Sequence, residues 1–400
     1  MQIRSITVGI DATWPFAPAS VDEAGRFLAR ARRAFEGAGF VVQTTRLCTQ
    51  AASRFLAPSQ LPDFARALDA ACGAAGIGYA AAGGIALGGA WTETDAASAV
   101  ADAVCASERV FSSLAIASEA GVDYRAARAA ASIIARIASR TADGFGNLRF
   151  AALARCPTGI PFFPGAVHAG GASRFALALQ AADLAVEAFR PAGSLDECEA
   201  RLVAALEATG ARLAAVADGL AHETGVAYGG VDLSLAPFPF DDGSVAGALE
   251  SLGLDRFGGA GTVLATWRLT SALKRARVER CGFSGCMMPL LEDSVLARRA
   301  AEGLFSVAEL LLFSAVCGTG LDTVPLPGDV GEAELAAILL DVAGLASALA
   351  KPLTARLFPV PGKRAGDETA FDFPFFANSR VLAVKGHGAA RLIARALDEK

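Results

Sequence analysis

Segments with helical periodicity alternate with short apolar runs, and this alternation restricts the possible folds more than any other feature of the sequence. Three segments of the first half carry the helical pattern: 21–37, 61–73 and 124–141. Four runs are typical of strands: 1–10, 40–47, 76–80 and 110–116. Strands separated by such helices indicate β-α-β units, and these units build a mostly parallel sheet.

The rest of the chain continues in the same style. Seven further segments are predicted to be helices: 175–189, 194–219, 263–279, 294–300, 306–313, 331–350 and 386–398. No fixed-period repeat and no linker interrupts the 400 residues, so we expect one large α/β domain over residues 1–400. With 53% hydrophobic and 19% charged residues, the chain has a large core and a thin charged surface. This ratio fits a large globule or an oligomer that buries part of its surface, and we expect a homo-oligomer.

Charge and composition exclude several classes of function. A net charge of −5 argues against nucleic acid as a partner, because a phosphate-binding surface needs clustered Lys and Arg. The longest stretch without charge, residues 71–92, is rich in glycine and too weakly apolar for a membrane span. The first ten residues lack the cationic start and apolar run of a secretion signal, and the eight cysteines fit reduced thiols. We therefore expect a cytoplasmic protein whose partner is a small-molecule ligand.

The segment Ser314–Asp329 concentrates polar chemistry on a constrained backbone. Gly318 and Gly320 let the chain turn sharply and approach a ligand closely. Pro325 and Pro327 hold the following residues extended and remove two backbone donors. The loop presents four polar side chains: Cys317, Thr319, Asp322 and Asp329. We interpret it as a functional loop, and a merely structural turn is the alternative.

Other loops share this composition of Gly, Pro, acidic and aromatic residues, and binding residues concentrate in such loops. They lie at 144–168, 229–237, 282–293 and 359–372. Together with the cysteine loop, their motifs resemble the prokaryotic domain-of-unknown-function family number seven hundred eleven. The resemblance extends from the first strand to about residue 380, and its most specific segments are 231–237, 258–262, 282–285, 289–293, 317–325, 351–357 and 361–367.

The resemblance implies a fold. The family is similar to pyruvate formate-lyase, an α/β protein with a ten-stranded barrel of two parallel five-stranded halves that are antiparallel to each other and ringed by helices. Central loops carry the chemistry in that architecture. We therefore expect the loops near residues 165, 232, 292, 320 and 367 to meet in one cavity.

A glycyl radical enzyme is the first activity that this fold suggests. It needs a central cysteine, which Cys317 could supply, and a glycine within an Arg-Val-x-Gly-Tyr motif near the C-terminus. The corresponding residues here run from Arg380 to Val384, with Ala383 at the glycine position. Because alanine lacks the special stability of a glycine backbone radical, we expect a mechanism without a glycyl radical.

Cys317 as a polar nucleophile is the second interpretation. Thiolate chemistry needs a lowered pKa, which a neighbouring cation or histidine supplies. His168 lies in a loop rich in Pro, Gly and aromatic residues and is the best partner candidate. The alternative is that Cys317 is a small buried apolar residue and that His168 is structural.

A divalent cation is the third interpretation, since loop oxygens are the ligands that Mg²⁺ and Ca²⁺ prefer. Four carboxylates are candidate ligands: Glu292, Asp293, Asp322 and Asp367. Asp322 is also a candidate catalytic residue together with Cys317 and His168. The alternative is that single acids cap helices or turns, as Asp293 would do directly before a helical segment.

The sequence as a whole predicts a non-radical enzyme that acts on a small polar, anionic metabolite in a central cavity. Five residues are candidates for substrate binding: Asp232, Ser234, Thr319, Arg356 and Lys363. No nucleotide cofactor is expected, because the G-x-G-x-x-A pattern at 76–81 follows a helix rather than a strand, and the chain has no Walker loop. The competing class is a non-catalytic small-molecule-binding or regulatory protein on a former radical-enzyme scaffold.

Overall fold

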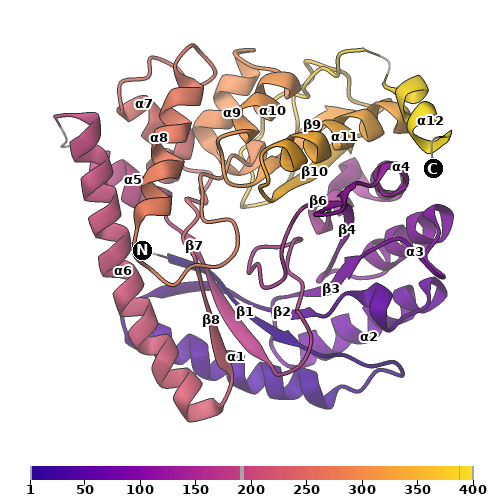
Figure 1. Cartoon of the computed structure of the whole chain (residues 1–400), viewed down its shortest axis with the longest axis horizontal. Coiled ribbons are helices and arrows are strands. Elements are labelled where there is room, and N and C mark those ends of the chain that lie inside the picture. Colours follow the sequence, from indigo (N-terminus) through magenta and orange to yellow (C-terminus); the bar gives the residue numbers. More distant parts are fainter. Residues whose placement is uncertain (1, 190–192, 387, 399–400) are drawn as a thin grey trace.

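The computed structural model describes residues 2–189, 193–386 and 388–398, and it is a mixed α/β structure (Figure 1). Within these residues, one sheet contains ten strands. They are β1 Gln2–Ile10, β2 Val41–Thr49, β3 Tyr79–Ile85, β4 Val110–Ser118, β5 Gly121–Val122, β6 Phe150–Ala154, β7 Arg174–Gln180, β8 Ala227–Asp232, β9 Gly320–Pro327 and β10 Leu353–Val360. Along the sheet the order is β8-β7-β1-β2-β3-β4-β6-β10-β9, and the short β5 pairs with β4.

The strands fall into two groups of opposite direction. The β-α-β pattern of the first 154 residues produces five mutually parallel neighbours, β1, β2, β3, β4 and β6. β7 is antiparallel to β1 and parallel to β8, while β10 is antiparallel to β6 and parallel to β9. Two pairs of reversed strands therefore flank the parallel group.

Helices surround the sheet, as Figure 1 shows. In chain order they are α1 Ala19–Gly37, α2 Leu61–Ala74, α3 Glu93–Cys105, α4 Tyr124–Arg140, α5 Ala182–Phe189, α6 Leu195–Thr224, α7 Val245–Ser251, α8 Thr262–Arg275, α9 Ser294–Ala301, α10 Val307–Ser314, α11 Glu332–Ala348 and α12 Ala390–Asp398. Short 3₁₀ turns include η3 Ala142–Arg149 and η5 Leu290–Glu292. The main core cluster lies between helices and strands, because the apolar stripe of each amphipathic helix is buried there. No helix among the described residues is long and apolar enough to cross a bilayer.

The helix predicted over 175–189 is wrong in its first half, where the chain forms β7 before α5 begins. Phe175 and Leu177 pack in the main core, while Ala178 belongs to a separate cluster on the inner face of the sheet. A strand that is apolar on both faces loses the alternation that identifies strands in a sequence. The helix predicted over 386–398 begins only at Ala390, and residue 387 lies outside the described part of the chain.

A long loop between β6 and β7 fills the inner face of the sheet. The hydroxyls of Ser5 and Thr7 on β1 both donate to the carbonyl oxygen of Pro161, at 3.2 and 2.9 Å. Phe163 packs against Phe111 of β4 with ring centroids 5.2 Å apart. This loop therefore packs directly against β1 and β4.

The segment 280–289 links the two ends of the strand order. It makes isolated parallel bridges from Arg280 to Val231 and from Cys286 to Leu235, next to β8, and from Pro289 to Asp322 of β9. The amide of Gly318 also donates to the carbonyl oxygen of Cys286 at 2.6 Å. The chain thus passes directly between the two edge strands of the sheet.

Candidate functional site: a charged cavity inside the sheet

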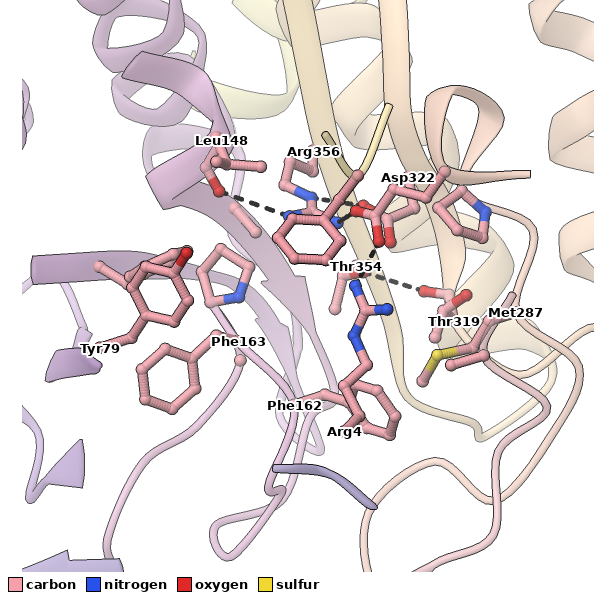
Figure 2. A pocket seen from close by; sticks show the side chains of 18 of the residues that line it. Arg4, Tyr79, Leu148, Phe162, Phe163, Met287, Thr319, Asp322, Thr354 and Arg356 are labelled. Carbon is pink, nitrogen blue, oxygen red and sulfur yellow. Dashed lines mark hydrogen bonds and ion pairs between the residues drawn. The ribbon is translucent and has the colours of Figure 1, made fainter. Parts of the chain in front are cut away.

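The main candidate site is a cavity of about 80 Å³ between the two groups of strands. Roughly 10–15 Å³ is enough for one water molecule, so this cavity has room for a small metabolite. Figure 2 shows Arg4 and Tyr79 of the parallel group facing Asp322 and Arg356 of the reversed strands. Four of the five predicted loop regions reach the lining, through Gly165, Pro237, Glu292 and Thr319. The fifth, 359–372, does not; Phe373 directly after it does.

Two carboxylates and two arginines form an ion-pair network at one wall of the cavity. Glu292 of η5 receives Arg4 on one carboxylate oxygen and Arg356 on the other, the latter at 2.7 Å. The Nε of Arg356 donates to Asp322 of β9 at 2.6 Å. Neighbouring strands β9 and β10 run parallel, which brings Asp322 and Arg356 together across the ladder. Charged hydrogen bonds of this kind fix the direction of each side chain.

The network separates the pKa values of its two carboxylates. Burial opposes ionisation of Glu292, but Arg4 and Arg356 outweigh it and hold the pKa of Glu292 below its ordinary value. Burial also dominates at Asp322, where Arg356 compensates only in part, so the pKa of Asp322 is raised. One carboxylate therefore stays ionised while the other is adjusted toward proton transfer, a pattern typical of acid–base sites.

Arg46 of β2 is the third arginine in the lining, and it has no carboxylate partner among the described residues. Its guanidinium carbon lies 5.2 Å from the ring centre of Phe163 and 5.6 Å from that of Tyr79. Its Nε donates to the hydroxyl of Thr44 at 2.9 Å. Burial, with a smaller contribution from Arg4, lowers the pKa of Arg46 to about 9, so it remains charged at neutral pH.

The lining therefore holds one more arginine than carboxylates. An unpaired buried charge is unfavourable, and binding of an anion would compensate it. The described lining contains no other charged side chain. The cavity is thus electrostatically suited to a small anion.

Asp232 and Ser234, predicted to bind substrate, lie behind the lining rather than in it. Asp232 is fully buried and accepts from the amides of Phe283 and Ser284 at 2.7 and 2.9 Å. Burial raises the pKa of Asp232 although these hydrogen bonds favour its ionised form. The pair fixes the loop that carries Phe283 into the cavity.

Asp293 serves as a helix cap, the alternative given for it from the sequence. Its carboxylate accepts from Val295 and Leu296 at the start of α9, and from Val245 and Ala246 at the start of α7. One buried acid thus satisfies orphan amide groups of two helices. These contacts use both of its carboxylate oxygens, and Asp293 is not among the residues that line the cavity.

Cys317 is buried and does not line the cavity, whereas Thr319 two residues later does. The sulfur of Cys317 accepts from the amide of Gly320 at 3.4 Å. Lys351 reinforces this turn, because its Nζ donates to the carbonyl oxygen of Cys317 at 2.6 Å and to that of Ser314 at 2.9 Å. Of the polar residues predicted in this loop, Thr319 and Asp322 line the cavity and the thiol does not.

His168 lines a different cavity, of about 210 Å³, together with Cys48 and Cys281. Its Nε2 lies 3.7 Å from an oxygen of Asp11. The loop 158–168 contributes Phe163 to the charged cavity and Ile160 to this second one. The structure therefore does not place His168 and Cys317 in one site.

The four predicted metal ligands are not brought together. Glu292 and Asp322 share Arg356, Asp293 caps helices, and the Asp367 carboxylate accepts from the amide of Arg364 at 2.7 Å. No group of three His, Cys, Asp or Glu side chains in the described residues is arranged to hold a metal ion. Lys363, predicted to bind an anion, also lies outside the cavity lining.

Sequence reasoning missed Arg4, Arg46 and Tyr79, all of which line the cavity. The available signal was a single charged residue within each of two otherwise uncharged strand patterns, 1–10 and 40–47. A buried strand rarely carries an arginine unless it is paired or faces a cavity. Only the tertiary structure shows which face of each strand lines the cavity.

Fold and site together define an α/β protein with a charged cavity lined by strands and loops. The chain matches the model of the family described as Uncharacterised ACR (DUF711) over residues 1–377, and it belongs to that family. The resemblance stated from the sequence motifs is therefore confirmed at the family level.

Several proteins named UPF0210 protein are similar to this chain. One from Pyrobaculum arsenaticum is 40% identical over 281 residues, which cover 67% of this chain and 61% of the relative. One from Desulforudis audaxviator is 32% identical over 305 residues, covering 74% and 67%. One from Pelotomaculum thermopropionicum is 31% identical over 349 residues, covering 83% and 76%. The chain thus matches about six tenths of the length of the first of these relatives.

Proposed function

We propose that this protein is a non-radical enzyme that uses acid–base chemistry on a small anionic metabolite bound in the charged cavity. The observation that carries the proposal is a cavity lining with three arginines and only two carboxylates. Arg4 and Arg356 pair with the carboxylates, whereas Arg46 has no carboxylate partner in the described chain. Clustered groups with displaced pKa values in a cavity are typical of active sites.

Each charged residue has a distinct role in this proposal. Arg46 binds the anionic group of the substrate, and contacts with the rings of Tyr79 and Phe163 hold its guanidinium in place. Asp322 gives or takes the proton, because its raised pKa brings it closer to neutrality than an ordinary aspartate. Glu292 and Arg356 are positioning residues that fix the direction of Asp322.

Aromatic side chains support the proposal by limiting water in the cavity. Phe162, Phe283, Phe373 and Phe375 line it together with Phe163. A low-polarity lining strengthens the interactions of the charged groups and of a bound anion. The proposed proton transfer is routed through side chains, with Arg4 and Arg356 supplying the positive charge beside the carboxylates.

We also infer that the strands close into a barrel like that of pyruvate formate-lyase, with the segment 280–289 as the element between β8 and β9. Its parallel bridges to Leu235 and Asp322 support this reading. A reversed group of β7, β8, this segment, β9 and β10 would then match the parallel group in number. The single-domain and homo-oligomer expectations stay predictions.

Anion binding tests the proposal first. We expect formate, acetate or phosphate to raise the melting temperature of the wild-type protein, and we expect Arg46→Met to abolish the shift because no other arginine of the lining lacks a carboxylate. Arg33→Met, at an exposed position on α1, is the matched control and should leave the shift intact. An unchanged shift in Arg46→Met would refute the assigned anion site.

Turnover then separates the two classes of function. Wild type and Asp322→Asn are incubated with a small-metabolite extract, and anions are followed by mass spectrometry. The amide can still accept from Arg356, so we expect retained binding and a loss of turnover of about 10²–10⁴-fold. Anion binding without turnover in either protein would favour the competing class, a non-catalytic small-molecule-binding protein.

A further inference from the structure

We infer that the ligand of the charged cavity is a small hydroxycarboxylate, with its carboxylate on Arg46 and its hydroxyl at Thr319 and Asp322; this inference rests on the proposed function. Figure 2 shows the rings of Tyr79 and Phe163, which flank Arg46, on one side of the cavity and Thr319 with Asp322 on the other. A ligand that satisfies both sides needs two different polar groups.

The first group is a carboxylate rather than a phosphate. With Glu292 and Asp322 ionised, the described lining carries one positive charge in excess, which one carboxylate neutralises. The planar guanidinium of Arg46 lies beside two aromatic rings, and a planar carboxylate matches its fork of donors. A phosphate dianion would bring a second negative charge into an enclosed site without a partner.

The second group is a hydroxyl. Thr319 is 3% exposed, and its hydroxyl has no hydrogen-bond partner in the described structure. Buried hydroxyls are normally paired, so this one is available to a ligand. Arg4 and Arg356 already surround the adjacent carboxylates, and an ammonium group would meet like charge there. A neutral hydroxyl can both donate and accept, as Thr319 and Asp322 require.

Matched ligand pairs test the inference on the intact protein by isothermal titration calorimetry. Acetate is compared with glycolate and glycine, propionate with lactate, and all with inorganic phosphate. We expect each hydroxy acid to bind about tenfold more tightly than its deoxy analogue, which corresponds to about one hydrogen bond. Titration in two buffers of different ionisation enthalpy should show no proton uptake on binding of a hydroxy acid. Binding of a dianion would instead be accompanied by uptake of a proton at Asp322.

Thr319→Val removes the hydroxyl with little change of volume, and it should reduce the preference for the hydroxy acids to within about twofold. Thr266→Val is the matched control, because Thr266 of α8 is also buried with an unpaired hydroxyl but lies outside the cavity. The Thr266→Val variant should still bind each hydroxy acid about tenfold more tightly than its deoxy analogue. If Thr319→Val does not fold, the wild-type ligand pairs decide alone.

Several results would overturn the inference: equal affinity for acetate and glycolate, tighter binding of glycine or phosphate, or an unchanged preference in Thr319→Val. These leave the proposed function standing as long as Arg46→Met still abolishes anion binding. Failure of every anion in the series to bind would remove the proposed function as well, so the two failures are distinguishable.

Discussion

At the scale of single residues, Glu292 is the centre of the ion-pair network in the cavity. The sequence favoured it as a metal ligand, since it follows a rigid apolar segment within an acidic loop. In the structure its two oxygens accept hydrogen bonds from Arg4 and Arg356, which are 352 residues apart in the sequence. Positive charge reaches this carboxylate from β1 and β10, and no local sequence pattern connects those two strands.

Replacing Glu292 with Gln should destabilise the protein by about 3–5 kcal/mol at neutral pH, because Arg4 loses its carboxylate partner and the buried Arg356 keeps only Asp322. Glu223→Gln is the control, since its pair with Arg30 is half-exposed and should contribute at most about 1 kcal/mol. Urea unfolding of both variants measures the difference. A loss at Glu292 no larger than at Glu223 would contradict the role of the network.

The pH dependence of this effect has a defined sign. The folded-state pKa of Glu292 lies below its unfolded value of about 4.3, so its stabilisation is complete above that pH. It is lost as the pH falls through the lower, folded-state pKa. The difference between wild type and Glu292→Gln should therefore be constant from pH 6 to 7 and decrease below about pH 4.

At the scale of elements, two glycines let the segment 280–289 pass against the cysteine loop. A Cβ added to Gly285 would lie 2.6 Å from the Cα of Gly318, which is closer than real Cβ contacts. The two segments could not approach each other this closely if both positions carried side chains. Gly318, which the sequence assigned to ligand approach, therefore also serves with Gly285 to bring two backbones together.

Gly285→Ala should destabilise the protein by about 1–3 kcal/mol through overpacking and should weaken anion binding, because Thr319 and Met287 shift with the two segments. Gly344→Ala on α11 is the control, since its added Cβ meets nothing within 4 Å and alanine favours the helix. Thermal unfolding and acetate titration report both effects. A neutral Gly285→Ala would mean that the segments separate easily.

At the scale of the whole molecule, the inferred barrel has a testable consequence at its closing segment. The amides of Leu235 and Met287 donate to Gly285 and Leu235 at 3.1 and 3.3 Å, and Gly318 donates to Cys286. If these bonds complete a ring, no edge remains for solvent to open. Hydrogen exchange followed by mass spectrometry should show peptides covering 233–237 and 284–289 nearly as protected as β10. Exchange as fast as in an unfolded peptide would rule out closure.

The sequence alone determined the class of fold, the family and most of the helices. Amphipathic periodicity and Gly/Pro punctuation are local properties, so α1, α4 and α11 lie close to their predicted ranges. Asp322, Thr319, Glu292 and Arg356 were also identified, because polar residues next to glycines and prolines stand out in a chain this apolar.

Only the tertiary structure decided which of these residues share a cavity and what each one does. β7 is buried on both faces and carries no alternation, so its existence depended on its neighbours β1 and β8. Arg46 gains its role from rings on other segments, and Asp293 is diverted from the site by the amides of two helices. Long-range pairing places these groups within a few ångströms, and the energy of a charge depends on that surrounding rather than on its position in the chain.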